Sequence, residues 1–230
     1  IFNIKKIKKI YLTASGGPFY KKRFSDLKNI SFNEAIKHPK WKMGYKNSID
    51  SATLVNKCLE IVEAHYLFDI PYENLDIVIH PDALVHSIIE NKNYTINMNL
   101  FKNDMAIPII NFLTNINKYK FSNDAYSNKF YLSKIQNLNF CQIEDKNFPI
   151  YKYFKNINKK KPKNIIKFNV GNEYAVNLFK NGQIKYTDIY KFIKKVGSLN
   201  LYSSLNNIKD IINYHEKIYK LIQDTHTTNY

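Results

Sequence analysis

Long apolar runs and cysteines are scarce in this chain of 230 residues. No apolar run approaches the roughly 18 residues that a helix needs to span a bilayer, so we expect no membrane-spanning helix and no membrane partner. The two cysteines, Cys58 and Cys141, cannot form the disulfide framework of a small secreted protein. A reducing compartment therefore suits the composition best, and the 44% apolar content is enough for a substantial core.

Arginine is also scarce, since Arg23 is its only example. The formal net charge is nevertheless +16 because lysine is abundant, and a basic surface can attract the phosphates of nucleic acid. Arginine is the preferred bidentate reader of bases and phosphates, and this chain hardly uses it. The lysines come with abundant Asn, Ile, Tyr and Phe, which indicates a bias toward A- and T-rich codons. We predict no nucleic-acid partner, although a basic nucleic-acid-binding module stays an alternative.

Neither a Walker phosphate loop nor the glycine fingerprint of dinucleotide-binding domains occurs in the sequence. What is present is a glycine pair, Gly16 and Gly17, separated by three residues from a predicted strand at residues 7–12. Two glycines after a strand let the backbone turn its N–H groups toward an anion, because no Cβ stands in the way. Taken alone, this segment indicates only a turn.

Residues 51–68 have the pattern of one long helix. Asp50 and Ser51 are residue types whose side-chain oxygens cap helices, and an apolar-periodic run follows them. Spacings of three and four predict a buried face that consists of Ala52, Val55, Leu59, Val62 and Tyr66.

Thr53, Asn56, Lys57 and Glu60 form a second, polar stripe on this predicted helix. The exposed N–H groups and the dipole of a helix N-terminus favour an anion, so the Ser51 hydroxyl, the Asn56 amide and the Lys57 ammonium suit a phosphate. Glu60 would repel a phosphate, and its carboxylate suits a divalent cation or a proton. A partly exposed amphipathic helix with a solvated polar stripe explains the same spacing. The spacing alone leaves both interpretations open.

Four segments together resemble the signature segments of 1-deoxy-D-xylulose 5-phosphate reductoisomerase, in the same order. They are Thr13–Phe19, His38–Gly44, Ile49–Thr53 with Asn56, Lys57 and Glu60, and Ile79–Pro81 with His86 and Ser87. Two later segments, Asn169–Val176 and Gly182–Ile189, resemble the C-terminal helical domain of that family. The resemblance spans nearly the whole chain and is weakest between residues 115 and 147.

The resemblance implies an oxidoreductase and isomerase of the non-mevalonate pathway of isoprenoid biosynthesis. The family converts 1-deoxy-D-xylulose 5-phosphate to 2-C-methyl-D-erythritol 4-phosphate, with NADPH as the reductant. A divalent metal ion, Mn²⁺, Mg²⁺ or Co²⁺, acts as a Lewis acid on the substrate oxygens. The resemblance further implies a homodimer in a bacterial cytoplasm or a plastid stroma.

The same resemblance implies a phosphate site that consists of Ser15, Ser51, Asn56 and Lys57. His38 would contact the bound phosphosugar, and Glu60 would contact the substrate and ligate the metal ion. The implied catalytic residues are His38, Lys57 and Glu60.

Residues 38–44 would form a flap that closes over the substrate and excludes water, with Trp41 and Met43 on it. Gly44 would lie against the nicotinamide cofactor. The family's NADPH-binding domain and two further metal carboxylates would precede Ile1, so we expect these residues to be the catalytic and C-terminal part of a longer polypeptide, inactive alone. A degenerate homologue that serves as a dimerisation scaffold stays a second alternative.

The coarse pattern predicts an α+β fold. Short strands at 7–12, 76–79 and 94–99 and helices at 32–37, at 51–68 and from residue 104 make up a mixed α/β catalytic domain at 1–114. An Asn-rich linker at 115–147 precedes a small C-terminal helical bundle at 148–230. Its helices are expected at 172–181, from Thr187 or Asp188, and from Asn206 or Asn207. The last helix has an apolar stripe of Ile208, Ile211, Ile212, His215, Ile218 and Ile222.

Overall fold

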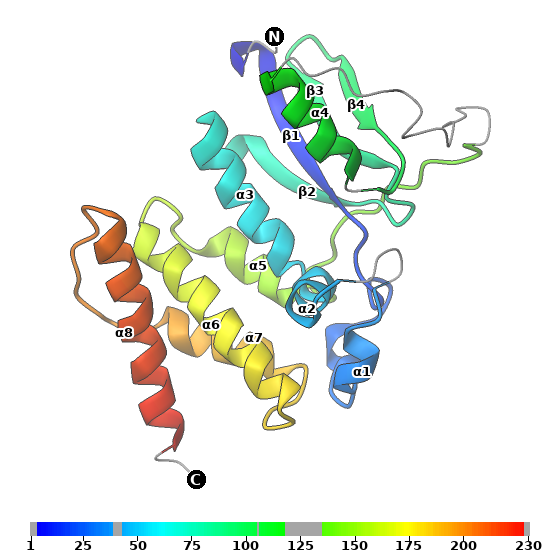
Figure 1. The fold of residues 1–230 in the computed structure, drawn as a ribbon. Helices are drawn as coiled ribbons and strands as arrows, with labels where there is room; N and C mark the ends of the chain where they lie inside the picture. Colours follow the sequence, from blue (N-terminus) through cyan, green and yellow to red (C-terminus); the bar gives the residue numbers. More distant parts are fainter. Residues whose placement is uncertain (1–3, 39–42, 105, 118–134, 228–230) are drawn as a thin grey trace. The chain divides into compact units, whose positions relative to one another are not determined.

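The computed structural model describes residues 4–38, 43–104, 106–117 and 135–227 (Figure 1). Two compact units divide the chain: residues 1–15 with 65–142, and residues 16–64 with 143–230. Each unit takes two separate stretches of the chain. These compact units have different bounds from the predicted consecutive domains at 1–114, 115–147 and 148–230. The predicted domains stay a prediction.

The first unit contains a mixed four-stranded sheet with the strand order β2-β1-β3-β4. β1 pairs in parallel with β2 and antiparallel with β3, and β3 pairs antiparallel with β4. The strands are β1 (Ile7–Ala14), β2 (Leu75–Ile79), β3 (Val85–Asn91) and β4 (Ile96–Leu100). Three of them confirm predicted strands, whereas β3 was not predicted. The unit also contains η1 (Ile4–Lys6), η3 (Tyr72–Asn74) and α4 (Ala106–Asn117).

The second unit is helical (Figure 1). Its first stretch contains η2 (Phe24–Leu27), α1 (Phe32–Ala35), α2 (Tyr45–Thr53) and most of α3 (Val55–Phe68). Its second stretch contains α5 (Pro149–Asn156), α6 (Pro162–Lys180), α7 (Asp188–Gly197) and α8 (Ile208–Thr227). A core cluster of α6, α7 and α8 side chains includes Val170, Tyr174, Val196, Tyr214 and Ile218.

Local signals explain several helix ends. α6 ends at Lys180, and Gly182 follows its C-cap with φ +71°. The Gln183 N–H donates to the Leu178 carbonyl at 2.9 Å, as in a Schellman cap. Asn207 caps α8, since its Oδ1 accepts from the Asp210 N–H at 2.9 Å. A mixed sheet with a C-terminal helical region confirms the predicted fold class. Within the described residues, every helix is too short or too polar to cross a membrane.

The predicted helix at 51–68 was wrong in one respect, because two helices occupy this region. α2 begins at Tyr45, with Gly44 as its N-cap, so Asp50 and Ser51 lie inside α2 and cap nothing. Leu54 adopts the left-handed conformation, with φ 64°, and separates α2 from α3. A left-handed residue interrupts the helical hydrogen bonding, so α3 has an N-terminus of its own at Val55.

The predicted buried faces were also partly wrong. On α3 the buried residues are Val55, Cys58 and Ile61, whereas Tyr66 is 60% exposed. The α3 face is shifted because the left-handed Leu54 interrupts the helix, so the three-and-four spacing does not run on from α2 into α3. Exposed residues of the predicted α8 stripe are Ile208, Ile211 and Ile212. Ile218 and Ile222 of the predicted stripe are buried, together with Tyr214, which was not part of it. The helix predicted at 172–181 begins ten residues earlier, at Pro162, because proline is favourable in the first turn.

Candidate functional site

The junction of α2 and α3 places polar side chains at the start of a helix. Leu54 alone separates the two helices, and Asn56 and Lys57 lie in the first turn of α3. The first N–H groups of a helix have no partner inside the helix, and together with the helix dipole they favour an anion. The helix end that suits a phosphate is therefore the start of α3 and not the residues at Ser51.

Asn56, Lys57 and Glu60 form one hydrogen-bonded cluster. The Glu60 carboxylate accepts from Asn56 Nδ2 at 2.6 Å and from Lys57 Nζ at 2.7 and 2.9 Å. The Lys57 and Glu60 side chains are 24% and 33% exposed, so solvent and a small ligand can both reach the pair. In this arrangement a single carboxylate neutralises the ammonium group.

The two predicted serines lie in different units. Ser51 is half-buried on α2, in the same unit as the α3 cluster. Ser15 is buried directly after β1 and belongs to the first unit. In the second unit, Gly17 lies against α2, since a Cβ on it would stand 2.6 Å from Ala52 Cα. Gly17 therefore provides close packing on the helix that carries Ser51.

The predicted flap is described at its two ends. His38 is half-buried after α1, and burial lowers the pKa of its imidazole, which favours the neutral ring. Met43 is 37% exposed and Gly44 is exposed. Trp41 lies outside the described residues. Among the described residues, nothing lies within 4 Å of the place where a Cβ on Gly44 would stand.

Metal-ligand groups are sparse in the described part of the chain. Among those residues, no three His, Cys, Asp or Glu side chains converge in a way that could hold a metal ion. Glu60 is therefore a single carboxylate candidate, and its fit to a divalent ion is partial. Further oxygen ligands would have to come from water or from a bound substrate.

A buried polar pair close to this site was not predicted as functional. Asp50 is 2% exposed and Asn172 is 0% exposed, and Asn172 Nδ2 donates to Asp50 Oδ1 at 2.8 Å. Lys46 Nζ also donates to the Asp50 carboxylate at 2.5 Å. Asp50 and Asn172 are 122 positions apart, and no sequence pattern pairs residues at such a separation. The one available signal was an acidic residue among the apolar positions of a helix.

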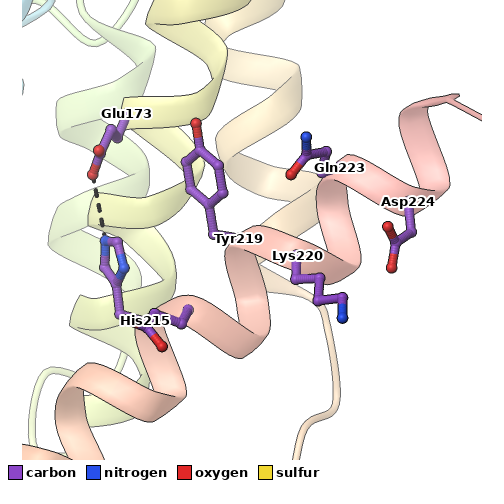
Figure 2. Close-up of a pocket in the computed structure, with 7 residues that line it drawn as sticks. Glu173, His215, Tyr219, Lys220, Gln223 and Asp224 are labelled. Atoms are coloured by element: carbon purple, nitrogen blue, oxygen red, sulfur yellow. Dashed lines mark hydrogen bonds and ion pairs between the residues drawn. The ribbon is translucent and has the colours of Figure 1, made fainter.

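A pocket of about 750 Å³ lies elsewhere, between α6 and α8 (Figure 2). Figure 2 shows the His215 ring directed toward Glu173, with 3.4 Å between His215 Nε2 and the Glu173 carboxylate. The pocket is lined by Glu173, His215, Glu216, Tyr219, Lys220, Gln223 and Asp224. None of these is a predicted site residue, and the pocket carries carboxylates where a phosphate site needs donors.

Two family models match this chain. Residues 2–68 match the model of the 1-deoxy-D-xylulose 5-phosphate reductoisomerase C-terminal domain. Residues 100–221, more than half of the chain, match the model of the DXP reductoisomerase C-terminal domain. The chain belongs to the 1-deoxy-D-xylulose 5-phosphate reductoisomerase family.

Relatives in this family come from bacteria and from a parasite. The 1-deoxy-D-xylulose 5-phosphate reductoisomerase of a Sulfurihydrogenibium species is 39% identical over 219 residues, covering 95% of this chain and 57% of the relative. The Clostridium tetani reductoisomerase is 41% identical over 189 residues, covering 82% of this chain and 48% of the relative. The apicoplastic reductoisomerase of Plasmodium falciparum is 35% identical over 228 residues, covering 99% of this chain and 46% of the relative. The chain thus spans about half the length of these relatives.

Solved structures of the family share the fold. A DOX-P reductoisomerase in complex with NADPH, fosmidomycin and magnesium matches with a TM-score of 0.83 at 31% identity, over 95% of this chain and 55% of that chain. The reductoisomerase from Zymomonas mobilis in complex with NADPH matches with a TM-score of 0.82 at 27% identity, over 94% of this chain and 55% of that chain.

Proposed function

We propose that this protein supplies the phosphosugar site and the C-terminal region of a 1-deoxy-D-xylulose 5-phosphate reductoisomerase. The reaction is the NADPH-dependent conversion of 1-deoxy-D-xylulose 5-phosphate to 2-C-methyl-D-erythritol 4-phosphate in the non-mevalonate pathway. Family membership and the Asn56, Lys57 and Glu60 cluster at the start of α3 support this proposal. The cluster carries it, because it offers one ammonium, one amide and one carboxylate beside a helix N-terminus.

In the proposed site, the phosphate site consists of Ser15, Ser51, Asn56 and Lys57. Lys57 contributes a full positive charge, and Asn56 contributes an amide donor next to the N–H groups of the first α3 turn. Ser51 contributes a hydroxyl from α2, in the same unit as Asn56 and Lys57. A phosphate monoester has enough acceptor oxygens for all four donors.

Lys57 and Glu60 exchange partners when substrate binds. Their ion pair, at 2.7 Å, holds both side chains in place without a ligand. With substrate and metal present, Glu60 would hold the divalent cation and Lys57 would hold the phosphate. Both groups remain neutralised, so the exchange leaves no isolated charge.

The metal ion and NADPH have partial sites in these residues. Glu60 would ligate Mg²⁺, Mn²⁺ or Co²⁺, and the ion, when bound, supplies Lewis-acid stabilisation of negative charge on the substrate oxygens. Gly44 would lie against the nicotinamide. NADPH, when bound, supplies the hydride.

His38 and the flap complete the proposed site. A neutral His38 can donate one hydrogen bond and accept another, which suits contact with substrate hydroxyl groups. Met43 and Trp41 on the flap would exclude water from the phosphosugar and so strengthen the charge interactions of Lys57. The proposal includes a homodimer in a bacterial cytoplasm or a plastid stroma.

Lys57→Ala tests the phosphate site. We expect this change to weaken binding of 1-deoxy-D-xylulose 5-phosphate by about 10- to 100-fold, because a charged hydrogen bond contributes roughly 1.5–3 kcal/mol. Isothermal titration calorimetry measures the dissociation constant. Lys152→Ala, which removes an equally charged side chain that is 54% exposed, serves as the control and should bind as the unchanged protein does.

Glu60→Gln separates the two charges of the cluster. We expect this variant to keep most of its affinity for the phosphosugar without metal, and to lose the gain in affinity that Mg²⁺ gives the unchanged protein.

Equal binding by Lys57→Ala and the unchanged protein would contradict the proposal. A folded protein that binds neither metal nor phosphosugar would instead favour a non-catalytic scaffold.

A further inference from the structure

Two hydrogen bonds join α2 to α6. Asn172 Nδ2 on α6 donates to Asp50 Oδ1 on α2 at 2.8 Å, and the Tyr45 hydroxyl on α2 donates to Asn177 Oδ1 on α6 at 3.1 Å. The two bonded residues are five positions apart on each helix. Their order along the chain is reversed between α2 and α6, because Tyr45 pairs with Asn177 and Asp50 with Asn172. The two contacts therefore fix the position of α2 along α6 and also its rotation about its own axis.

The Asp50 contact is fully enclosed. Asp50 and Asn172 are 2% and 0% exposed, and a carboxylate at such a place is unfavourable unless donors surround it. Asn172 and Lys46 provide those donors. Within the described residues, Asn172 Oδ1 has no hydrogen-bond partner, so the amide is held in place by its contact with Asp50.

The orientation of α2 determines where the start of α3 lies. Ser51 directly follows Asp50, and α2 ends at Thr53, with Leu54 as the single residue between the helices. Thr53 Oγ1 donates to the Ile49 carbonyl at 3.0 Å and accepts from the Val55 N–H at 3.5 Å. A rotation of α2 would therefore move the Ser51 hydroxyl and the first turn of α3 together.

We infer that Asn172 and Asp50 are positioning residues of the phosphate site, through which the C-terminal helix α6 holds Ser51, Asn56 and Lys57 in their binding geometry. This inference rests on the proposed function. Neither residue needs to touch the substrate. Their bond has a functional effect because charged hydrogen bonds to a phosphate depend steeply on distance and angle.

Asn172→Ala and Tyr45→Phe test the inference with inorganic phosphate as the probe. Asn172→Ala removes the amide that holds Asp50, and Tyr45→Phe removes only the hydroxyl that reaches Asn177. At a temperature where far-UV circular dichroism shows each variant to be folded, we expect phosphate to bind about tenfold more weakly to Asn172→Ala and about threefold more weakly to Tyr45→Phe. Asn169→Ala, an equal truncation of a half-buried asparagine on α6, is the matched control and should bind normally.

A purely structural role for the contact would lower the midpoint of unfolding and leave the dissociation constant for phosphate unchanged. Unchanged binding by both folded variants would therefore overturn the inference, and Tyr45→Phe decides alone if Asn172→Ala does not fold. If the unchanged protein binds no phosphate, the proposed function fails and the inference fails with it. If the unchanged protein binds and Lys57→Ala does not, while both α2–α6 variants bind normally, only the inference fails.

Discussion

Asp50 is a buried carboxylate with an unusual set of neighbours. Burial raises the pKa of its carboxyl above the ordinary value of 3.8, whereas Lys46 and the hydrogen bond from Asn172 oppose the rise, and Glu173 adds to it. The nearby Tyr186 is buried as well, and burial and the charge of Asp50 together raise the pKa of its hydroxyl. A raised carboxyl pKa means that the folded protein binds this proton more tightly than the unfolded chain does.

Asp50→Asn should therefore change how stability depends on pH. The contribution of Asp50 to stability is largest below pH 3.8 and is lost as pH rises through its raised pKa, because only the folded state favours the proton. We expect the free energy of unfolding of Asp50→Asn, minus that of the unchanged protein, to increase between pH 4 and pH 7. Urea unfolding at several pH values measures this difference.

Asp188→Asn is the matched control, with the opposite sign. The hydrogen bond from Lys191 lowers the pKa of the Asp188 carboxyl, so its stabilising effect is present above pH 3.8 and is lost as pH falls through the lowered value. The free energy of unfolding of Asp188→Asn, minus that of the unchanged protein, should therefore decrease as pH rises toward 3.8 and then stay level. A difference for Asp50→Asn that falls or stays level between pH 4 and pH 7 would contradict the sign assigned to Asp50.

Residues with a local signal could be predicted from the sequence, and residues with a distant partner could not. Asn56, Lys57 and Glu60 are three and four positions apart, and this spacing places them on one helix face. Their contacts in the structure follow that spacing. Asp50 looked like a helix cap, because nothing near it in the sequence indicates Asn172 as its partner.

At the scale of elements, the close approach of Gly17 to α2 limits what can stand at that position. Gly17 has φ +68°, and a Cβ there would lie 2.6 Å from the Ala52 Cα and 3.1 Å from the Ala52 nitrogen. Both atoms belong to the backbone of a helix, which cannot move aside as a flexible side chain can. Gly17 is therefore required by backbone conformation and by space.

Gly17→Ala should destabilise the protein by at least about 2 kcal/mol, since it combines a left-handed residue with a backbone clash. Thermal unfolding followed by circular dichroism measures the loss. Gly44→Ala is the comparison variant: among the described residues a Cβ on Gly44 meets nothing within 4 Å, so this variant loses only the N-cap preference for glycine over alanine, about 0.5–1 kcal/mol. Equal stability of the two variants would show that α2 can shift away from residue 17.

The break between α2 and α3 had no signal in the sequence. Leucine is among the better helix formers, and a left-handed leucine has a conformational cost. Leu54 is nevertheless left-handed and 0% exposed, so burial of its side chain offsets that cost. By contrast, the end of α6 before Gly182 was predictable, because glycine is the usual residue for a left-handed helix cap.

At the scale of the whole molecule, the second unit joins the start of α3 to a core formed by the C-terminal helices. Ile218 on α8 is 0% exposed and belongs to a cluster with Val170 and Tyr174 of α6. α6 also carries Asn172. Apolar side chains of α6 thus pack against α8, and Asn172 and Asn177 of α6 form hydrogen bonds with α2.

Ile218→Ala should lower the free energy of unfolding by about 2–5 kcal/mol, because it leaves a cavity in this core. Ile212→Ala is the matched control on the same helix, since Ile212 is 51% exposed and its loss should cost less than about 1 kcal/mol. Urea unfolding measures both. Similar losses for the two variants would contradict the assignment of Ile218 to the core and Ile212 to the surface of α8.

The fold class could be predicted because short apolar strands and capped helices have local patterns. The division into compact units could not, since each unit consists of two stretches that are separated in the sequence. The strand β3 was missed for a similar reason. Its partners are β1 and β4, and its burial pattern is irregular, so it lacks the strict alternation of β2.

This interleaving restricts how the gene can be rearranged. Residues 65–142 interrupt the coding sequence of the helical unit, so no uninterrupted piece of the gene encodes that unit. A single recombination crossover inside the interruption would bring α2 from one parent together with α6 from the other. If the two parents differ at position 50 or 172, the chimera would lose the hydrogen bond between these residues. We therefore expect working chimeras from parents that both carry Asp50 and Asn172.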